Sequence, residues 1–71
     1  MTLNHIRKNK KITQFNLAKQ LFVDQTTISK YECGKISPTI EQLPKLAKIL
    51  GCSIEEIVYA LIETKKESFN H

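Results

Sequence analysis

A short segment in the first half of the chain carries side chains that can hydrogen-bond to another molecule. Gln25, Thr26, Ser29 and Lys30 fall on the outer face of one predicted helix, whereas Ile28 falls on its inner face. A helix with such a polar face can lie in the major groove of DNA, which is wide enough to admit it. Polar residues also cover the exposed helices of proteins that bind nothing, so the surrounding sequence must decide between these interpretations.

The elements that position this helix are predicted to be helices as well, because strand signals are almost absent. At 71 residues the chain has room for one domain. Apolar residues recur at helical spacing in five segments. The expected helices cover residues 2–9, 14–22 and 25–31, a fourth segment ending at Leu50 and a fifth beginning with the capping box Ser53-x-x-Glu56. Residues 1–63 would form the domain, and residues 64–71 a polar, frayed tail.

Residues typical of helix ends mark several of these boundaries. Thr13 and Asp24 are suited to cap the second and third helices, because their side-chain oxygens can accept free backbone N–H groups. The fourth helix has two candidate starts. Thr39 and Gln42 resemble a capping box, but a start nearer Gln42 leaves Pro44 in the first turn, where proline is tolerated.

The charge of the chain favours a polyanionic partner. The formal net charge is +4, and an excess of positive charge suits nucleic acid. Basic residues cluster early in the sequence, whereas most acidic residues gather late. This asymmetry predicts one basic face and one more acidic end.

The sequence disfavours several other classes of protein. No apolar run approaches the ~20 residues that span a bilayer, and Met1 to Lys11 includes no stretch typical of a signal peptide. We therefore expect a cytoplasmic protein with no membrane contact. Cys33 and Cys52 have no zinc-like spacing to each other or to histidine, which predicts free thiols and no metal or cofactor. The sequence has no recognisable grouping of catalytic residues and no glycine-rich phosphate loop, so it does not indicate an enzyme.

A longer motif surrounds the polar helix and resembles a known family. The matching elements are Thr13-Gln14-x-x-Leu17-Ala18, then Thr27-Ile28-Ser29-Lys30-Tyr31-Glu32-x-Gly34-Lys35, then Pro38-Thr39, then Leu46-Ala47-x-x-Leu50-Gly51. Together they resemble the lambda-repressor-like helix-turn-helix domain of the XRE or Cro type, over about residues 3–61. The resemblance implies an all-α, compact five-helix bundle in which helices 2 and 3 form the helix-turn-helix. It also implies dimeric binding to operator DNA and regulation of transcription.

The resemblance further implies which side chains read bases. Gln25 and Thr26 start the recognition helix, where the family contacts base edges. Glutamine can bond bidentately to adenine, and threonine can bond a base edge or touch a thymine methyl. Lys30, one turn further on, can reach a guanine or a phosphate, or can be a solvated charge. Ser29 flanks this face as a lesser candidate.

Other matching residues are expected at the DNA backbone or inside the domain. Gln14, at the start of the second helix, and Lys35, after the recognition helix, are candidates to hold phosphates, although Lys35 can also be a solvated charge. Thr27 is a further phosphate candidate, and its hydroxyl can instead bond to its own backbone. Arg7 and Glu32 match a structural pair that ties the first helix to the end of the third.

Two phenylalanines depart from the family pattern. Phe22 occupies the turn position that many helix-turn-helix proteins give to glycine, and positive φ would cost a bulky residue about 1–2 kcal/mol there. The turn therefore follows another backbone path, or Phe22 tolerates the strain through packing. Phe15 shares one side of the second helix with Lys19 and Phe22. It either packs locally, with Phe69 and the tail folding over it, or joins Phe22 in a protein-partner surface separate from the DNA face.

The fifth helix predicts the assembly of the protein. Val58 and Ile62 extend its apolar stripe beyond what one bundle face needs, which indicates a symmetric homodimer through this helix. Its recognition helices would meet major grooves about 34 Å apart. The leading interpretation is a repressor that binds a short palindromic operator in double-stranded DNA. The alternative is an antitoxin or anti-repressor-controlled module, whose main partner is another protein.

Overall fold

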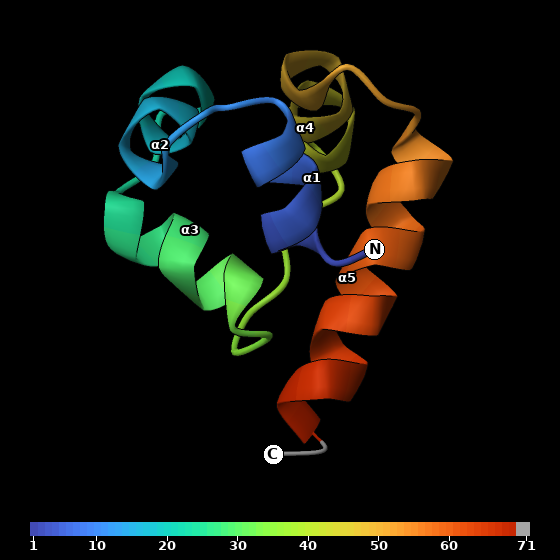
Figure 1. Ribbon diagram of the computed structural model, residues 1–71. Helices are drawn as coiled ribbons and strands as arrows, with labels where there is room; N and C mark the ends of the chain where they lie inside the picture. The colour runs from blue at the N-terminus through green and yellow to red at the C-terminus, as the bar shows by residue number, and fades with distance from the viewer. Residues whose placement is uncertain (70–71) are drawn as a thin grey trace.

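In the computed structural model, which describes residues 1–69 with side chains up to Glu67, the regular elements are five α-helices (Figure 1). They are α1 (Leu3–Asn9), α2 (Gln14–Leu21), α3 (Gln25–Glu32), α4 (Gln42–Leu50) and α5 (Ile54–Phe69). The predicted all-helical fold and the order of its helices are confirmed. Among the described residues, no helix combines the length and apolar character that crossing a membrane requires.

The five helices surround one core, and α1, α4 and α5 pack against the α2–α3 pair. α2 packs against α3 and α4, α4 packs against α5, and α1 packs against α3 and α5. In Figure 1, α2 and α3 lie together on one side, and α5 runs along the opposite side. The largest fully buried side chains come from all five helices; they are Leu3, Leu17, Ile28, Leu46, Leu50 and Ile57. Burying this apolar stripe of each helix fixes its rotation about its own axis. Ile28 and Tyr31 hold α3 in this way, so its opposite face points outward.

Side-chain caps define the starts of three helices. The Thr2 hydroxyl accepts the His5 N–H, and the His5 ring accepts the Thr2 N–H, which completes a capping box for α1. The Thr13 hydroxyl accepts the Asn16 N–H at 3.0 Å at the start of α2. The predicted box of Ser53 and Glu56 at the start of α5 is confirmed, since the two residues exchange hydrogen bonds. Each bond satisfies a donor that the helix itself leaves free.

Two other helix starts lack such a cap. Asp24 precedes α3 as predicted, but its side chain makes no capping hydrogen bond. α4 starts at Gln42, so Pro44 falls in its first turn and the later of the two candidate starts is confirmed. α4 ends before Gly51, which takes the left-handed conformation at φ +67° that favours glycine.

The tail predicted from residue 64 is wrong for residues 64–69, because α5 continues to Phe69. Thr64 is only 3% exposed. Its hydroxyl accepts the Leu3 N–H at 3.1 Å and donates to the Ala60 carbonyl at 2.8 Å. The polar side chain is thus buried because it satisfies a free donor of α1. The expected boundary after Glu63 falls inside this helix, and residues 70 and 71 lie outside the described part.

Candidate nucleic-acid interface

The outer face of α3 presents most of the side chains predicted to read bases. Gln25, Thr26 and Lys30 are exposed, and Ser29 and Thr27 are half-buried at the flank of this face. The first turn of α3 contains no acidic residue. An amide, a hydroxyl and an ammonium group are therefore displayed together on a helix that is fixed to the core by its other side.

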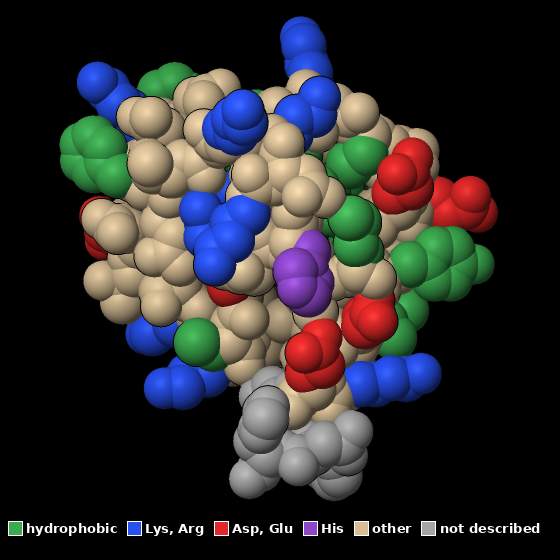
Figure 2. Space-filling view, viewed as in Figure 1, with side chains coloured by type: hydrophobic (Ala, Val, Ile, Leu, Met, Phe, Trp, Pro, Cys, Tyr) green, Lys and Arg blue, Asp and Glu red, His purple; other side chains and the backbone are tan. Residues whose placement is uncertain are grey.

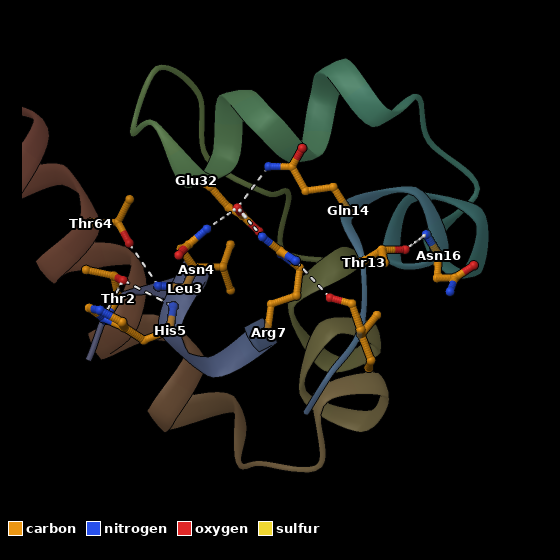
Figure 3. Close-up of polar contacts among 11 residues, drawn as sticks. Thr2, Leu3, Asn4, His5, Arg7, Thr13, Gln14, Asn16, Glu32 and Thr64 are labelled. Carbon is orange, nitrogen blue, oxygen red and sulfur yellow. Dashed lines mark hydrogen bonds and ion pairs between the residues drawn. The ribbon is translucent and has the colours of Figure 1, made fainter. Parts of the chain in front are cut away.

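A polar network anchors the end of α3 to α1 and α2 (Figure 3). Arg7 Nε donates to Glu32 Oε2 at 2.5 Å, and the same arginine donates to the Ile12 carbonyl at 2.8 Å. Glu32 Oε1 accepts from Asn4 at 2.9 Å and from Gln14 at 3.0 Å. The Arg7 and Glu32 side chains are only 9% and 5% exposed. A buried ion pair that is fully hydrogen-bonded resists displacement, so the network holds the end of α3 in place against α1 and α2.

The network also keeps the Glu32 carboxylate ionised. Burial by itself raises the pKa of Glu32, but the hydrogen bonds from Arg7, Gln14 and Asn4, together with the charge of Arg7, outweigh this effect. The pKa of Glu32 is therefore lowered from its ordinary value. Among the described residues, every buried side-chain nitrogen and oxygen atom has a hydrogen-bond partner.

The Gln14 side chain has a partner that the sequence did not indicate. It was predicted to clamp a phosphate, but its side-chain amide donates to Glu32, 18 positions away in the sequence. The same prediction included the free backbone N–H groups in the first turn of α2, which do not depend on this side chain. Asn4 was not predicted at all. Helical spacing relates residues three or four positions apart, so neither partnership could be found from local patterns.

The basic side chains cover mainly the part of the surface away from α5. Figure 2 shows most of the visible Lys and Arg side chains over the upper, central and left parts of the molecule, where α1, α2, α3 and α4 lie, and one at the lower right beside α5. Most of the acidic side chains visible in this view lie over α5. Lys35, in the loop after α3, is exposed, and it shares a hollow with Asn4 of α1 and Glu67 of α5. In this view most of the basic side chains are thus separated from the more acidic surface over α5, as the sequence predicts.

The turn between α2 and α3 passes through Phe22 in the left-handed conformation. Its φ and ψ are 59° and 42°, and its N–H donates to carbonyls of the last turn of α2. The alternative of another backbone path is therefore wrong. The Phe22 side chain is 91% exposed, so packing does not offset the cost of this conformation. Lys11 adopts a similar conformation at φ 58°, which the sequence did not indicate.

Phe15 adjoins the polar face of α3. Its side chain is 60% exposed, so the described residues do not cover it; the Phe69 side chain, expected above it, lies outside the described part. Phe15, Lys19, Val23 and Asp24 share a hollow of about 390 Å³ with Gln25. The surface at Phe15 is thus continuous with the recognition face, whereas one of the two alternatives for Phe15 placed it apart from that face.

Comparison with known proteins gives consistent matches. A family model described as helix-turn-helix matches residues 3–57. The HTH-type transcriptional activator BcrR of Enterococcus faecalis is 38% identical, with 93% of this chain and 35% of that protein aligned. The HTH-type transcriptional regulator DicA of Escherichia coli is 39% identical over 80% of this chain and 42% of its own length. The cryptic phage CTXphi transcriptional repressor RstR of Vibrio cholerae is 40% identical over 63% of this chain and 40% of its own length.

These three relatives are longer proteins than the present chain. The chain spans about a third to two fifths of their length. No solved structure matches the chain.

Proposed function

Because this chain belongs to the helix-turn-helix family, of the XRE type, we propose that it binds double-stranded DNA and regulates transcription, with α3 in the major groove. The observation that carries the proposal is the outward face of α3. Gln25, Thr26 and Lys30 are exposed there on a helix held by a buried network at its other end. The relatives with HTH names are transcriptional regulators by their printed names, which supports the same function here.

The contacts of this complex divide into two kinds. Gln25 and Thr26, with Ser29 and Lys30 beside them, face the base edges. Lys35 and Thr27 hold phosphates, together with the free N–H groups at Gln14 that begin α2. Phosphate contacts strengthen binding to any sequence, whereas base contacts distinguish one sequence from another.

The protein acts as a homodimer through α5 in this proposal. Ile54, Val58 and Ile62 are spaced four residues apart along α5 and remain exposed, with apolar side chains. Val58 and Ile62 also border a hollow of about 200 Å³ with Leu43 and Pro38, which offers a seat for side chains of a second copy. Two-fold symmetry then presents two copies of α3 to a palindromic operator. Sedimentation of Val58→Lys should give a monomer; a wild-type chain that is monomeric both free and on a two-half-site operator would contradict the dimer.

Repression is the simplest outcome of such binding. Occupying an operator blocks other proteins from the same DNA and needs no surface beyond the recognition face. One of the relatives, from Vibrio cholerae, is a repressor by its printed name.

Paired substitutions test the division between base and phosphate contacts. On a preferred site selected from random DNA, Gln25→Ala should cost about 1–3 kcal/mol and remove the preference at one position. Lys35→Ala should weaken binding to all sequences alike and make the salt slope shallower by about 1. Lys48→Ala is the matched control, because Lys48 is exposed in the last turn of α4, a helix that packs against α2 and α5.

The two substitutions can also give a result that overturns the proposal. If Gln25→Ala weakens binding equally on every sequence, or leaves all binding unchanged, Gln25 does not read a base and the proposed division of contacts is wrong. Fluorescence anisotropy at several salt concentrations supplies both affinities and slopes.

A protein partner is the second candidate function, because Phe22 is 91% exposed and Phe15 is 60% exposed on the α2 side. Exposed aromatic side chains are enriched in protein interfaces. In that case the chain serves as an antitoxin or an anti-repressor-controlled module. Selection that yields no preferred DNA sequence at any salt concentration would favour this function over the first.

A further inference from the structure

The hollow between α2 and α3 brings an apolar side chain beside a predicted base reader. We infer that Phe15 is a further specificity-determining residue, whose ring contacts the C5-methyl group of the thymine that pairs with the adenine bound by Gln25. The inference rests on the proposed function, because it requires α3 to lie in the major groove. It adds a contact from α2 to those expected from α3.

The position of Phe15 makes such a contact accessible. Phe15 is the second residue of α2 and Gln25 the first residue of α3, and both line the hollow of about 390 Å³. In the proposed complex, a base pair that meets the Gln25 amide lies within reach of the same hollow. The ring is 60% exposed in the free chain, so it has apolar surface left to bury against a ligand.

The chemistry of an adenine–thymine pair matches this arrangement. A glutamine that bonds to N7 and N6 of adenine leaves O4 and the C5-methyl group of the paired thymine on the same major-groove edge. The methyl group is the only apolar feature of that edge, and an aromatic ring is one of the side chains that contact it. A guanine–cytosine pair has no methyl group there. Gln25 and Phe15 would therefore both select the same base pair, Gln25 by contacting the adenine and Phe15 by contacting the thymine.

The charges of the hollow favour a base edge over a phosphate. Asp24 lines it, and its carboxylate makes no capping hydrogen bond to α3. A carboxylate repels a phosphate, and Lys19 on the opposite helix offsets this charge without making the hollow strongly basic. Val23 adds apolar surface to the lining. A neutral group with an apolar part is thus the ligand that this lining suits.

Replacement of thymine by deoxyuridine, which lacks only the methyl group, tests the inference. The probe is the preferred site selected from random DNA by the full chain, with each thymine replaced in turn. One replacement, at the pair whose adenine preference Gln25→Ala removes, should weaken wild-type binding about fourfold, the effect of withdrawing one methyl group from an apolar contact. Phe15→Ser should bind the thymine and deoxyuridine sites equally, and Phe15→Leu should retain part of the discrimination.

Phe22→Ser is the matched control. It removes an exposed aromatic side chain from the end of α2, and among the described residues Phe22 is not part of the hollow. It should leave the fourfold difference intact. Circular dichroism confirms that each variant is folded.

Several outcomes would overturn the inference. Phe15 does not read the methyl group if the Phe15→Ser variant still discriminates thymine from deoxyuridine. The same conclusion follows if the preferred site has no adenine–thymine pair at the position that Gln25 contacts. An unchanged discrimination together with loss of binding to a defined protein would assign Phe15 to a protein interface. Failure to select any preferred site overturns the proposed function itself, which distinguishes the two failures.

Discussion

Replacement of Phe22 by glycine should stabilise the domain. Phe22 has φ 59° and ψ 42°, a conformation that costs an L-residue with a side chain about 1–2 kcal/mol. Glycine removes that cost, because it has no Cβ, but its greater freedom in the unfolded chain offsets roughly 0.5–1 kcal/mol. The Phe22 side chain is 91% exposed, so its removal leaves no cavity. The net expectation is a gain of about 0.5–1 kcal/mol.

Thermal and urea unfolding of the wild type and Phe22→Gly measure this gain. For a domain of this size it corresponds to a rise in Tm of roughly 5 °C. Lys11→Gly should change stability in the same direction, because Lys11 has φ 58°. Phe15→Gly is the opposing control: Phe15 has ordinary helical geometry within α2, so glycine there should destabilise by about 1 kcal/mol.

The comparison between the two phenylalanines decides whether the reasoning is right. If Phe22→Gly and Phe15→Gly both destabilise by similar amounts, the turn carries no strain that glycine relieves. The side chain of Phe22 would then contribute to stability through contacts that the free domain does not reveal. Equal destabilisation would refute the strained-turn account.

Two further substitutions test the polar contacts that hold the helices together. Glu32→Gln should cost about 3 kcal/mol at neutral pH, because it leaves Arg7 buried without its counter-charge. The folded pKa of Glu32 lies below its ordinary value of 4.5, so the stability from the ionised group is complete above that value and is lost as the pH falls through the folded pKa. Glu32→Gln should therefore reduce the loss of unfolding free energy at acid pH. An unchanged loss at acid pH would assign it to other carboxylates. Thr64→Val should lower the free energy of unfolding by about 1–3 kcal/mol, because it leaves the Leu3 N–H without an acceptor. Thr64→Ser should retain most of the stability in urea unfolding. Equal losses from the two variants would mean that the hydroxyl does not stabilise the fold.

Local signals predicted the framework of this fold well. The capping box at Ser53, the position of Gly51 and the apolar spacing within α2 and α3 depend on residues close together in the sequence. Such short-range rules place helix ends and decide which side of a helix is buried. They are sufficient to turn Gln25 and Lys30 outward, because Ile28 must turn inward.

Contacts between distant residues were beyond those signals. The Thr64 hydroxyl meets a backbone group 61 positions away, so a residue that looks polar and terminal is buried and α5 is longer than expected. The Gln14 side chain likewise donates a hydrogen bond to Glu32, which lies 18 positions away in the sequence. The hollow that joins Phe15 to Gln25 depends on the angle between two helices. That angle follows from packing and from the turn at Phe22, which periodicity does not encode.

Selection of bound sequences from random double-stranded DNA by the full chain tests the central claim most directly. The claim is that the exposed face of α3 reads bases in the major groove, and that each of the two copies of α3 in the dimer reads one half-site. It predicts an enriched palindromic site whose half-sites are about one helical turn, or roughly 34 Å, apart. It also predicts that Gln25→Ala selects the same site with one symmetric pair of positions relaxed. No enriched sequence at any salt concentration, or an identical site from Gln25→Ala, would contradict it.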